Sequence, residues 1–210
     1  MKKYGMLMTP PLAQKAHDGD KTVTRRIIPL DIVNMFDEGT DPLMCENADG
    51  EPQLAADFAR YRRGMIVAVK ETHWRWGYYE KNENGNRRFV PITVEPEHPV
   101  LFADPYGYSR PRKLGYHKRP SLFLPFDLAR AHIKILDVRP ERLQDITGWD
   151  AMAEGVEDCD ICGHDDCFYG ASGQGYKCSF ERVWDSINGK TYPWASNCWV
   201  WRYEFERVEI

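Results

Sequence analysis

The sequence predicts a mainly β fold with a few short helices, in the α+β class, and three segments carry this prediction. Segment 64–69 is apolar enough to be a core strand, and segment 9–19 has the signals of a short capped helix. Near the C-terminal end, two sets of side chains alternate as on a strand with one aromatic and one mostly charged face: Trp199, Trp201, Tyr203 and Phe205 against Val200, Arg202, Glu204 and Glu206.

Length and composition favour one folded domain, residues 1–210. A chain of 210 residues can bury a sizeable core, and an aromatic content of 13% with seven tryptophans argues against disorder. The net charge of -4 gives no overall attraction to nucleic acid, so contact with RNA requires a local basic surface. Three segments offer one: 25–26, 60–63 and 110–119.

The sequence also predicts where the protein acts. No apolar run approaches the roughly 20 residues that span a bilayer, and the first residues lack the apolar core of a signal peptide. We therefore expect a cytoplasmic protein that has no membrane partner and needs no organic cofactor. In a reducing compartment the six cysteines are expected to be thiols or metal ligands.

The first helix is predicted from its caps. Thr9 suits the N-cap, Pro10 the first helical position, and Gly19 a left-handed C-terminal residue. A basic, β-branched segment follows, in which alternate side chains face opposite sides. Lys21 and Thr24 therefore lie on opposite faces, unless the chain bulges or Lys21 still belongs to the turn.

The middle of the chain combines strands with irregular insertions. Residues 31–60 are predicted to be an irregular insertion, and residues 75–120, rich in Gly, Pro, Asn, Arg and Tyr, to be a long excursion with one hairpin. Regular structure returns with a strand at 131–135, followed by a turn through Arg139 and Pro140.

Two further helices and the last strand complete the prediction. Thr147 caps a helix with Asp150 three residues later, and Gly155 ends it. The next helix starts near Ser179 and ends at 188–189. The side chains at helical spacing that it is expected to bury are Phe180, Val183, Trp184 and Ile187. The aromatic face of the last strand fits core packing, and it also fits a base-stacking platform.

The motif Gly-x-Lys-Thr-x-Thr-x-Arg at 19–26 resembles the signature of ASCH-domain proteins, small β-barrels related to the PUA family of RNA-binding domains. Segment 143–156 is similar to the short helix that follows a barrel strand in that family. Through segments 70–74, 184–189 and 199–201 the chain looks most like the longer ASCH-like proteins of phages and prophages. The resemblance implies a PUA-like barrel with insertions at 31–60, 75–120 and 157–179, and the host cytoplasm as location if the protein is phage-encoded.

The same resemblance implies an activity. In the bacterial ASCH amidohydrolases that remove the acetyl group from N(4)-acetylcytidine, the matching positions make Lys21 the proton acceptor, Thr24 the nucleophile and Glu154 the proton donor. The substrate is then an RNA or a modified nucleoside. The residues expected to bind it are Arg25, Arg26, Thr22, Glu71 and Trp74.

General chemistry supports this trio, although a structural interpretation is also open. A threonine hydroxyl needs an adjacent base, and burial can lower the pKa of a lysine enough to serve. A glutamate in an apolar setting can protonate a departing amine. Alternatively, Glu154 forms a salt bridge with Lys21 or Arg25, or is simply solvated, in the last turn of its helix.

The loop at 157–179 is predicted to hold a structural zinc ion. Its four candidate ligands are Cys159, Cys162, Cys167 and Cys178, with His164 as a possible replacement for one of them. Thiols without a metal, or a disulfide, are the alternatives. Four thiolates close the coordination sphere, which disfavours a catalytic zinc.

Three other functions remain open at this point. The first is a module that binds RNA or a nucleotide without catalysis, through the same basic and aromatic residues. The second is a ribonuclease, as reported for some ASCH-like proteins. The third is a phage protein directed at a host factor, with the insertions as the working surface.

Overall fold

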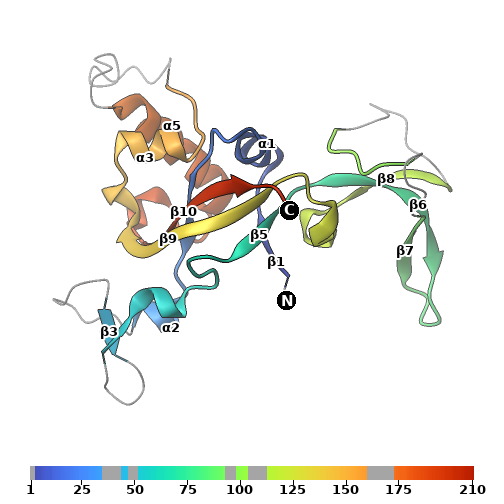
Figure 1. Cartoon of the computed structure of the whole chain (residues 1–210), viewed down its shortest axis with the longest axis horizontal. Helices are drawn as coiled ribbons and strands as arrows, with labels where there is room; N and C mark the ends of the chain where they lie inside the picture. The colour runs from blue at the N-terminus through green and yellow to red at the C-terminus, as the bar shows by residue number, and fades with distance from the viewer. Residues whose placement is uncertain (1–2, 35–43, 47–51, 93–97, 104–112, 160–172) are drawn as a thin grey trace. The chain divides into compact units, whose positions relative to one another are not determined.

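The computed structural model describes residues 3–34, 44–46, 52–92, 98–103, 113–159 and 173–210. These residues form an α+β fold of mostly strands and a few short helices, as the sequence predicts (Figure 1). The chain divides into two compact units that interleave in sequence: Met1–Gln14 with Ala68–Ala131 (unit 1), and Lys15–Val67 with His132–Ile210 (unit 2). The single domain expected from the sequence stays a prediction. No helix within the described ranges is long and apolar enough to cross a membrane.

The framework of unit 2 is an antiparallel sheet of long strands, with β10 between β9 and β2. Tyr203 of β10 lies opposite Thr24 of β2, and a bulge after Glu204 interrupts the pairing with β9. The first residues of β5 lie beside β9. The described ladders form open sheets, with no pair that closes a barrel. The bounds of these strands are β2 Val23–Ile27, β5 Ile66–Lys70, β9 His132–Arg142 and β10 Trp199–Val208.

The predicted aromatic face of β10 is confirmed as core at Trp201, Tyr203 and Phe205, which are buried, whereas Trp199 is only partly buried. The opposite face is also covered at its start, where Val200 joins a buried cluster with residues of two helices and Arg202 is buried as well. Figure 1 shows these helices, α3 and α5, side by side next to β10. The alternation of side chains predicted that one face of β10 is exposed to solvent, but the packing of α3 and α5 buries half of that face.

The predicted helix ends are confirmed where a local cap sets them. Helix α1 (Pro10–Asp18) is followed by Gly19 at φ 89°, and α3 (Gly148–Ala153) begins after Thr147, whose hydroxyl accepts the Asp150 N–H at 3.0 Å. Helix α5 (Gln174–Asn188) begins five residues before the predicted Ser179.

Two expectations for unit 2 are wrong. Ile187 is 52% exposed, because the buried stripe of α5 ends with Trp184. The turn expected at Arg139 and Pro140 is absent, because Pro140 lies within β9 opposite Trp201. A proline is tolerated in a strand where its missing N–H has no ladder partner.

Unit 1 contains the three-stranded sheet β7-β6-β8. Its strands are β6 (His73–Lys81), β7 (Arg87–Pro91) and β8 (Gly115–Arg119). The hairpin expected within 75–120 is therefore confirmed, and a third strand joins it. Its turn is organised by the Asn82 side chain, which accepts the N–H groups of Asn84 and Asn86 at 3.1 and 2.8 Å.

Short elements complete the described chain. In unit 1 they are β1 (Tyr4–Leu7), η2 (Ser121–Phe123) and η3 (Phe126–Leu128). In unit 2 they are α2 (Leu30–Val33), β3 (Met44–Glu46), β4 (Pro52–Leu54), η1 (Ala55–Phe58), η4 (Leu143–Asp145) and η5 (Trp194–Ser196). The expected insertion 31–60 thus includes one small antiparallel pair, β3 with β4, and partly lies outside the described residues.

Candidate functional site

A buried ion pair joins two of the three residues expected to act in catalysis. The Lys21 ammonium donates to the Val23 carbonyl at 2.8 Å, the Glu154 carbonyl at 2.7 Å and Glu154 Oε2 at 2.5 Å. Lys21 is 1% exposed and Glu154 4% exposed. Burial lowers the pKa of Lys21, and the Glu154 carboxylate acts in the opposite direction. All three protons of the ammonium have acceptors in this arrangement.

Local backbone structure brings these side chains together. The Lys21 N–H donates to the Lys15 carbonyl at 3.1 Å, so Lys21 belongs to the turn between α1 and β2. Strand alternation therefore does not apply between Lys21 and Thr24. Glu154 is the C-cap residue of α3, and the Thr22 N–H donates to the carbonyl of Ala153 at 2.9 Å, which ties β2 to the end of this helix.

Thr24 is buried on β2, and the three hydrogen bonds of the Lys21 ammonium within the described residues do not include its hydroxyl. The structure thus joins Lys21 and Glu154 directly and leaves the Thr24 hydroxyl unattached to either. Thr22, expected to contact substrate, is exposed next to them.

Arg25 extends the ion pair into a network. Its Nη1 lies 3.2 Å from Glu154 Oε1, its Nε donates to Glu141 Oε1 at 2.6 Å, and its Nη2 lies 3.4 Å from Asp150 Oδ2. Asp150 also accepts from Arg202 Nη2 at 2.9 Å. Burial acts to raise the pKa of Asp150, but the Arg202 hydrogen bond and the charges of Arg202 and Arg25 outweigh it and lower that pKa. Arg25 therefore acts here as the centre of an ion network, and its expected role in binding substrate stays a prediction.

Arg26 lies near the same carboxylate with two tyrosines. Burial lowers the pKa of Arg26, while the charge of Glu154 raises it. The rings of Tyr61 and Tyr203 meet edge-on with centroids 5.5 Å apart, and burial raises the pKa of both phenols. Arg25 thus pairs directly with Glu154, and the charge of Glu154 also acts on Arg26, the next residue of β2.

The other two residues expected to bind substrate lie in unit 1. Glu71 is buried, and its carboxylate accepts from Arg130 Nε at 2.7 Å and Nη2 at 2.9 Å. Trp74 is buried, and its backbone exchanges two hydrogen bonds with Leu101. Both side chains are buried, and their expected role in binding substrate stays a prediction.

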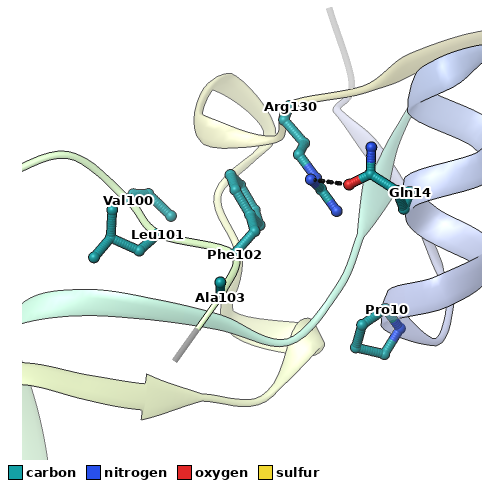
Figure 2. A pocket seen from close by; sticks show the side chains of 7 residues that line it. All are labelled: Pro10, Gln14, Val100, Leu101, Phe102, Ala103 and Arg130. Carbon is teal, nitrogen blue, oxygen red and sulfur yellow. Dashed lines mark hydrogen bonds between the residues drawn. The ribbon is translucent and has the colours of Figure 1, made fainter. Parts of the chain in front are cut away.

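Those neighbours line a cavity of about 650 Å³ in unit 1. Figure 2 shows Arg130 reaching toward Gln14, with Phe102 beside it. Arg130 Nη1 donates to Gln14 Oε1 at 2.5 Å, and the guanidinium lies 4.8 Å from the Phe102 ring centroid. The remaining lining is Pro10, Val100, Leu101 and Ala103. Arg130 and Gln14 could not be predicted as partners, because neither belongs to a motif.

His73, at the start of β6, is expected to make stability depend on pH. The side chain is 0% exposed, and burial lowers its pKa to about 4, with Arg119 and Arg75 contributing and the Glu71 carbonyl opposing. The unfolded chain therefore binds a proton below about pH 6.5 that the folded chain rejects, so stability falls as pH falls. The loss attributable to His73 is about 2 kcal/mol at pH 5.

Urea unfolding of wild type and His73→Leu at pH 7.5 and pH 5 checks this contribution. The variant should lose less stability on acidification than the wild type by that amount. An equal loss in both proteins contradicts it.

The expected zinc ligands are only partly described. Cys159 and Cys178 are half-buried, whereas Cys162, Cys167 and the possible substitute His164 lie outside the described residues. Among the described residues no group of His, Cys, Asp and Glu is arranged to hold a metal. The zinc site stays a prediction.

Comparison with known proteins finds no matching family model, no matching curated protein and no matching solved structure. The function therefore has to be inferred from the residues themselves.

Proposed function

We propose that this chain is an ASCH-type protein with a PUA-like barrel that recognises an RNA-derived base and hydrolyses an acyl amide on a modified cytidine. The observation that carries the proposal is the 2.5 Å bond between Lys21 Nζ and Glu154 Oε2, with both groups buried and Thr24 three residues along the chain. A lysine and a glutamate far apart in sequence meet at the positions that the ASCH motif assigns to proton acceptor and proton donor.

The buried pair can supply both catalytic groups at once. In water the pair is an ammonium and a carboxylate, but burial lowers the pKa of the Lys21 ammonium. Transfer of the shared proton from Lys21 to Glu154 produces a neutral amine and a neutral acid without changing the total charge. The amine is the base that Thr24 needs, and the acid is the donor that a departing amine needs.

The acyl group is then transferred to Thr24 and released to water in two steps. Thr24 Oγ1 bonds to the acyl carbon as Lys21 accepts its proton, and the C–N bond breaks as Glu154 protonates the cytidine nitrogen. Water next attacks the Thr24 ester and gives a proton to Glu154, while Lys21 returns its proton to the Thr24 oxygen. The first step requires the lone pair of the neutral Lys21 amine to turn from Glu154 Oε2 to the Thr24 hydroxyl, whose proton it accepts, while its two N–H groups can keep the carbonyls of Val23 and Glu154.

A second candidate is a module that binds the same ligand without catalysis. The observation in its favour is that every proton of the Lys21 ammonium already has an acceptor, and none of these acceptors is the Thr24 hydroxyl. In this case Lys21 fixes the end of α3 against β2, and the cations of β2 attract the phosphate of a nucleotide.

Turnover of acylated cytidines distinguishes the two candidates. N(4)-acetylcytidine, cytidine and short RNAs carrying either base are incubated with the protein, and products are read by mass. We expect release of acetate, reduced about 10³-fold or more in Thr24→Ala and Lys21→Ala, and partly retained in Thr24→Ser. Thr191→Ala, at an exposed threonine, is the matched control.

Full turnover by Thr24→Ala contradicts the nucleophile assignment. Binding of RNA without turnover of any substrate assigns the protein to the second candidate.

A further inference from the structure

One face of the sheet β7-β6-β8 collects cationic and aromatic side chains. Tyr79 lies opposite Phe89, and Arg75 lies opposite His117. Cross-strand partners share a face, and so do alternate residues of one strand. The register therefore places the following on one surface, here called the basic face: Arg75, Tyr79 and Lys81 of β6, Arg87 and Phe89 of β7, and His117 and Arg119 of β8.

Ring contacts hold the arginines of this face in place. The Arg87 guanidinium lies 4.7 Å from the Tyr79 ring centroid, and that of Arg119 lies 4.5 Å from the Phe89 centroid. Arg119 Nη1 also donates to the Tyr79 hydroxyl at 3.0 Å. Tyr79, Phe89 and His117 contact one another edge-on, with centroids 5.1 to 5.8 Å apart. Stacking on rings fixes a guanidinium plane and leaves N–H groups at its edge for a ligand.

The positive charge of the basic face is not neutralised by the described residues. Arg75, Lys81, Arg87 and Arg119 take part in none of the ion pairs found in the described ranges. The register places no carboxylate on this surface, since Glu80 points to the opposite face. Burial lowers the pKa of Arg75, and the charge of Arg119 lowers it further.

We infer that the basic face binds a single-stranded polynucleotide. Phosphodiester oxygens match the free N–H edges of the arginines in charge and geometry. Unstacked bases pack on guanidinium planes and on Tyr79, as in sequence-tolerant recognition of single strands. The inference does not depend on amide hydrolysis, because it concerns unit 1 and involves none of Lys21, Thr24 and Glu154.

Binding is measured by fluorescence anisotropy with a labelled 12-nucleotide U-rich RNA, at salt concentrations from 50 to 200 mM. If all four cations contact phosphates, the slope of log K against log salt should be about -3. Arg87→Gln should weaken binding severalfold and make the slope shallower by about 0.7. Arg88→Gln is the matched control, because Arg88 is the next residue of β7, is also exposed and faces the opposite side.

Two tyrosine variants test whether bases stack on the basic face. Tyr79→Leu should weaken binding about tenfold, whereas Tyr78→Leu, on the opposite face of β6, should leave it within twofold. Circular dichroism of both variants separates loss of contact from loss of folding. Equal losses from the two members of either pair overturn the inference.

Competing polyanions identify the ligand. Single-stranded DNA of equal length competes as strongly as RNA if the site binds any polynucleotide, and more weakly if the site prefers RNA. Either result supports the inference. Competition by heparin or polyglutamate at equal charge concentration as strong as that of RNA overturns it and indicates a general acidic partner. Because no turnover is measured, failure here leaves the proposed hydrolysis untouched.

Discussion

Replacing Glu154 by leucine is expected to lower the free energy of unfolding by about 3–5 kcal/mol. The carboxylate accepts from Lys21 and lies 3.2 Å from Arg25 Nη1, so its loss leaves two buried cations without this counter-charge. Desolvation of an unpaired buried charge costs more than the pair contributes. Urea unfolding at pH 7 measures the change. Glu157→Leu is the control, because Glu157 pairs with Lys15 at 3.1 Å but its side chain is 85% exposed.

The double variant Lys21→Met with Glu154→Leu tests whether the ion pair is needed for folding. If its stability returns to within about 1 kcal/mol of wild type, the ion pair is dispensable for folding, as for other buried pairs replaced by apolar residues. Retention of the pair then points to function. A loss below about 1 kcal/mol in Glu154→Leu alone contradicts the buried network itself.

Local signals made the site partly predictable. Lys21, Thr24 and Glu154 belong to motifs, and the caps at Thr147, Gly19 and Gly155 depend on the chain within one turn of each residue. An ion pair of Glu154 with either Lys21 or Arg25 was an open alternative at the level of sequence. The structure contains both pairs, and they share the two oxygens of one carboxylate.

The rest of the network could not be predicted, because its members meet only after the sheet and helices pack. The alternation of β10 predicts that Arg202 faces solvent, yet Arg202 is buried against Asp150 of α3. Glu141 follows Pro140, where a turn was expected, and reaches Arg25 only because β9 continues through the proline. Glu71 matched a motif, but its partner Arg130 comes from a segment with no pattern.

Gly148→Ala is expected to lower the free energy of unfolding by about 3 kcal/mol or more. A Cβ on Gly148 falls 2.3 Å from the carbonyl oxygen of Gly173, at the point where the first turns of α3 and α5 meet. Backbone atoms cannot move aside as a flexible side chain does, so the two helices must separate. Because Glu154 caps the other end of α3, the same displacement should weaken its contact with Lys21.

Thermal unfolding of Gly148→Ala beside Gly85→Ala checks this close approach. Gly85 adopts φ 77° in the β6–β7 turn, but an added Cβ there meets nothing within 4 Å, so its replacement should cost only about 1 kcal/mol of backbone strain. Equal stability losses in the two variants contradict helix separation as the cause. A larger loss in Gly148→Ala, with acetate release reduced in proportion, ties the packing of α3 on α5 to the placement of Glu154.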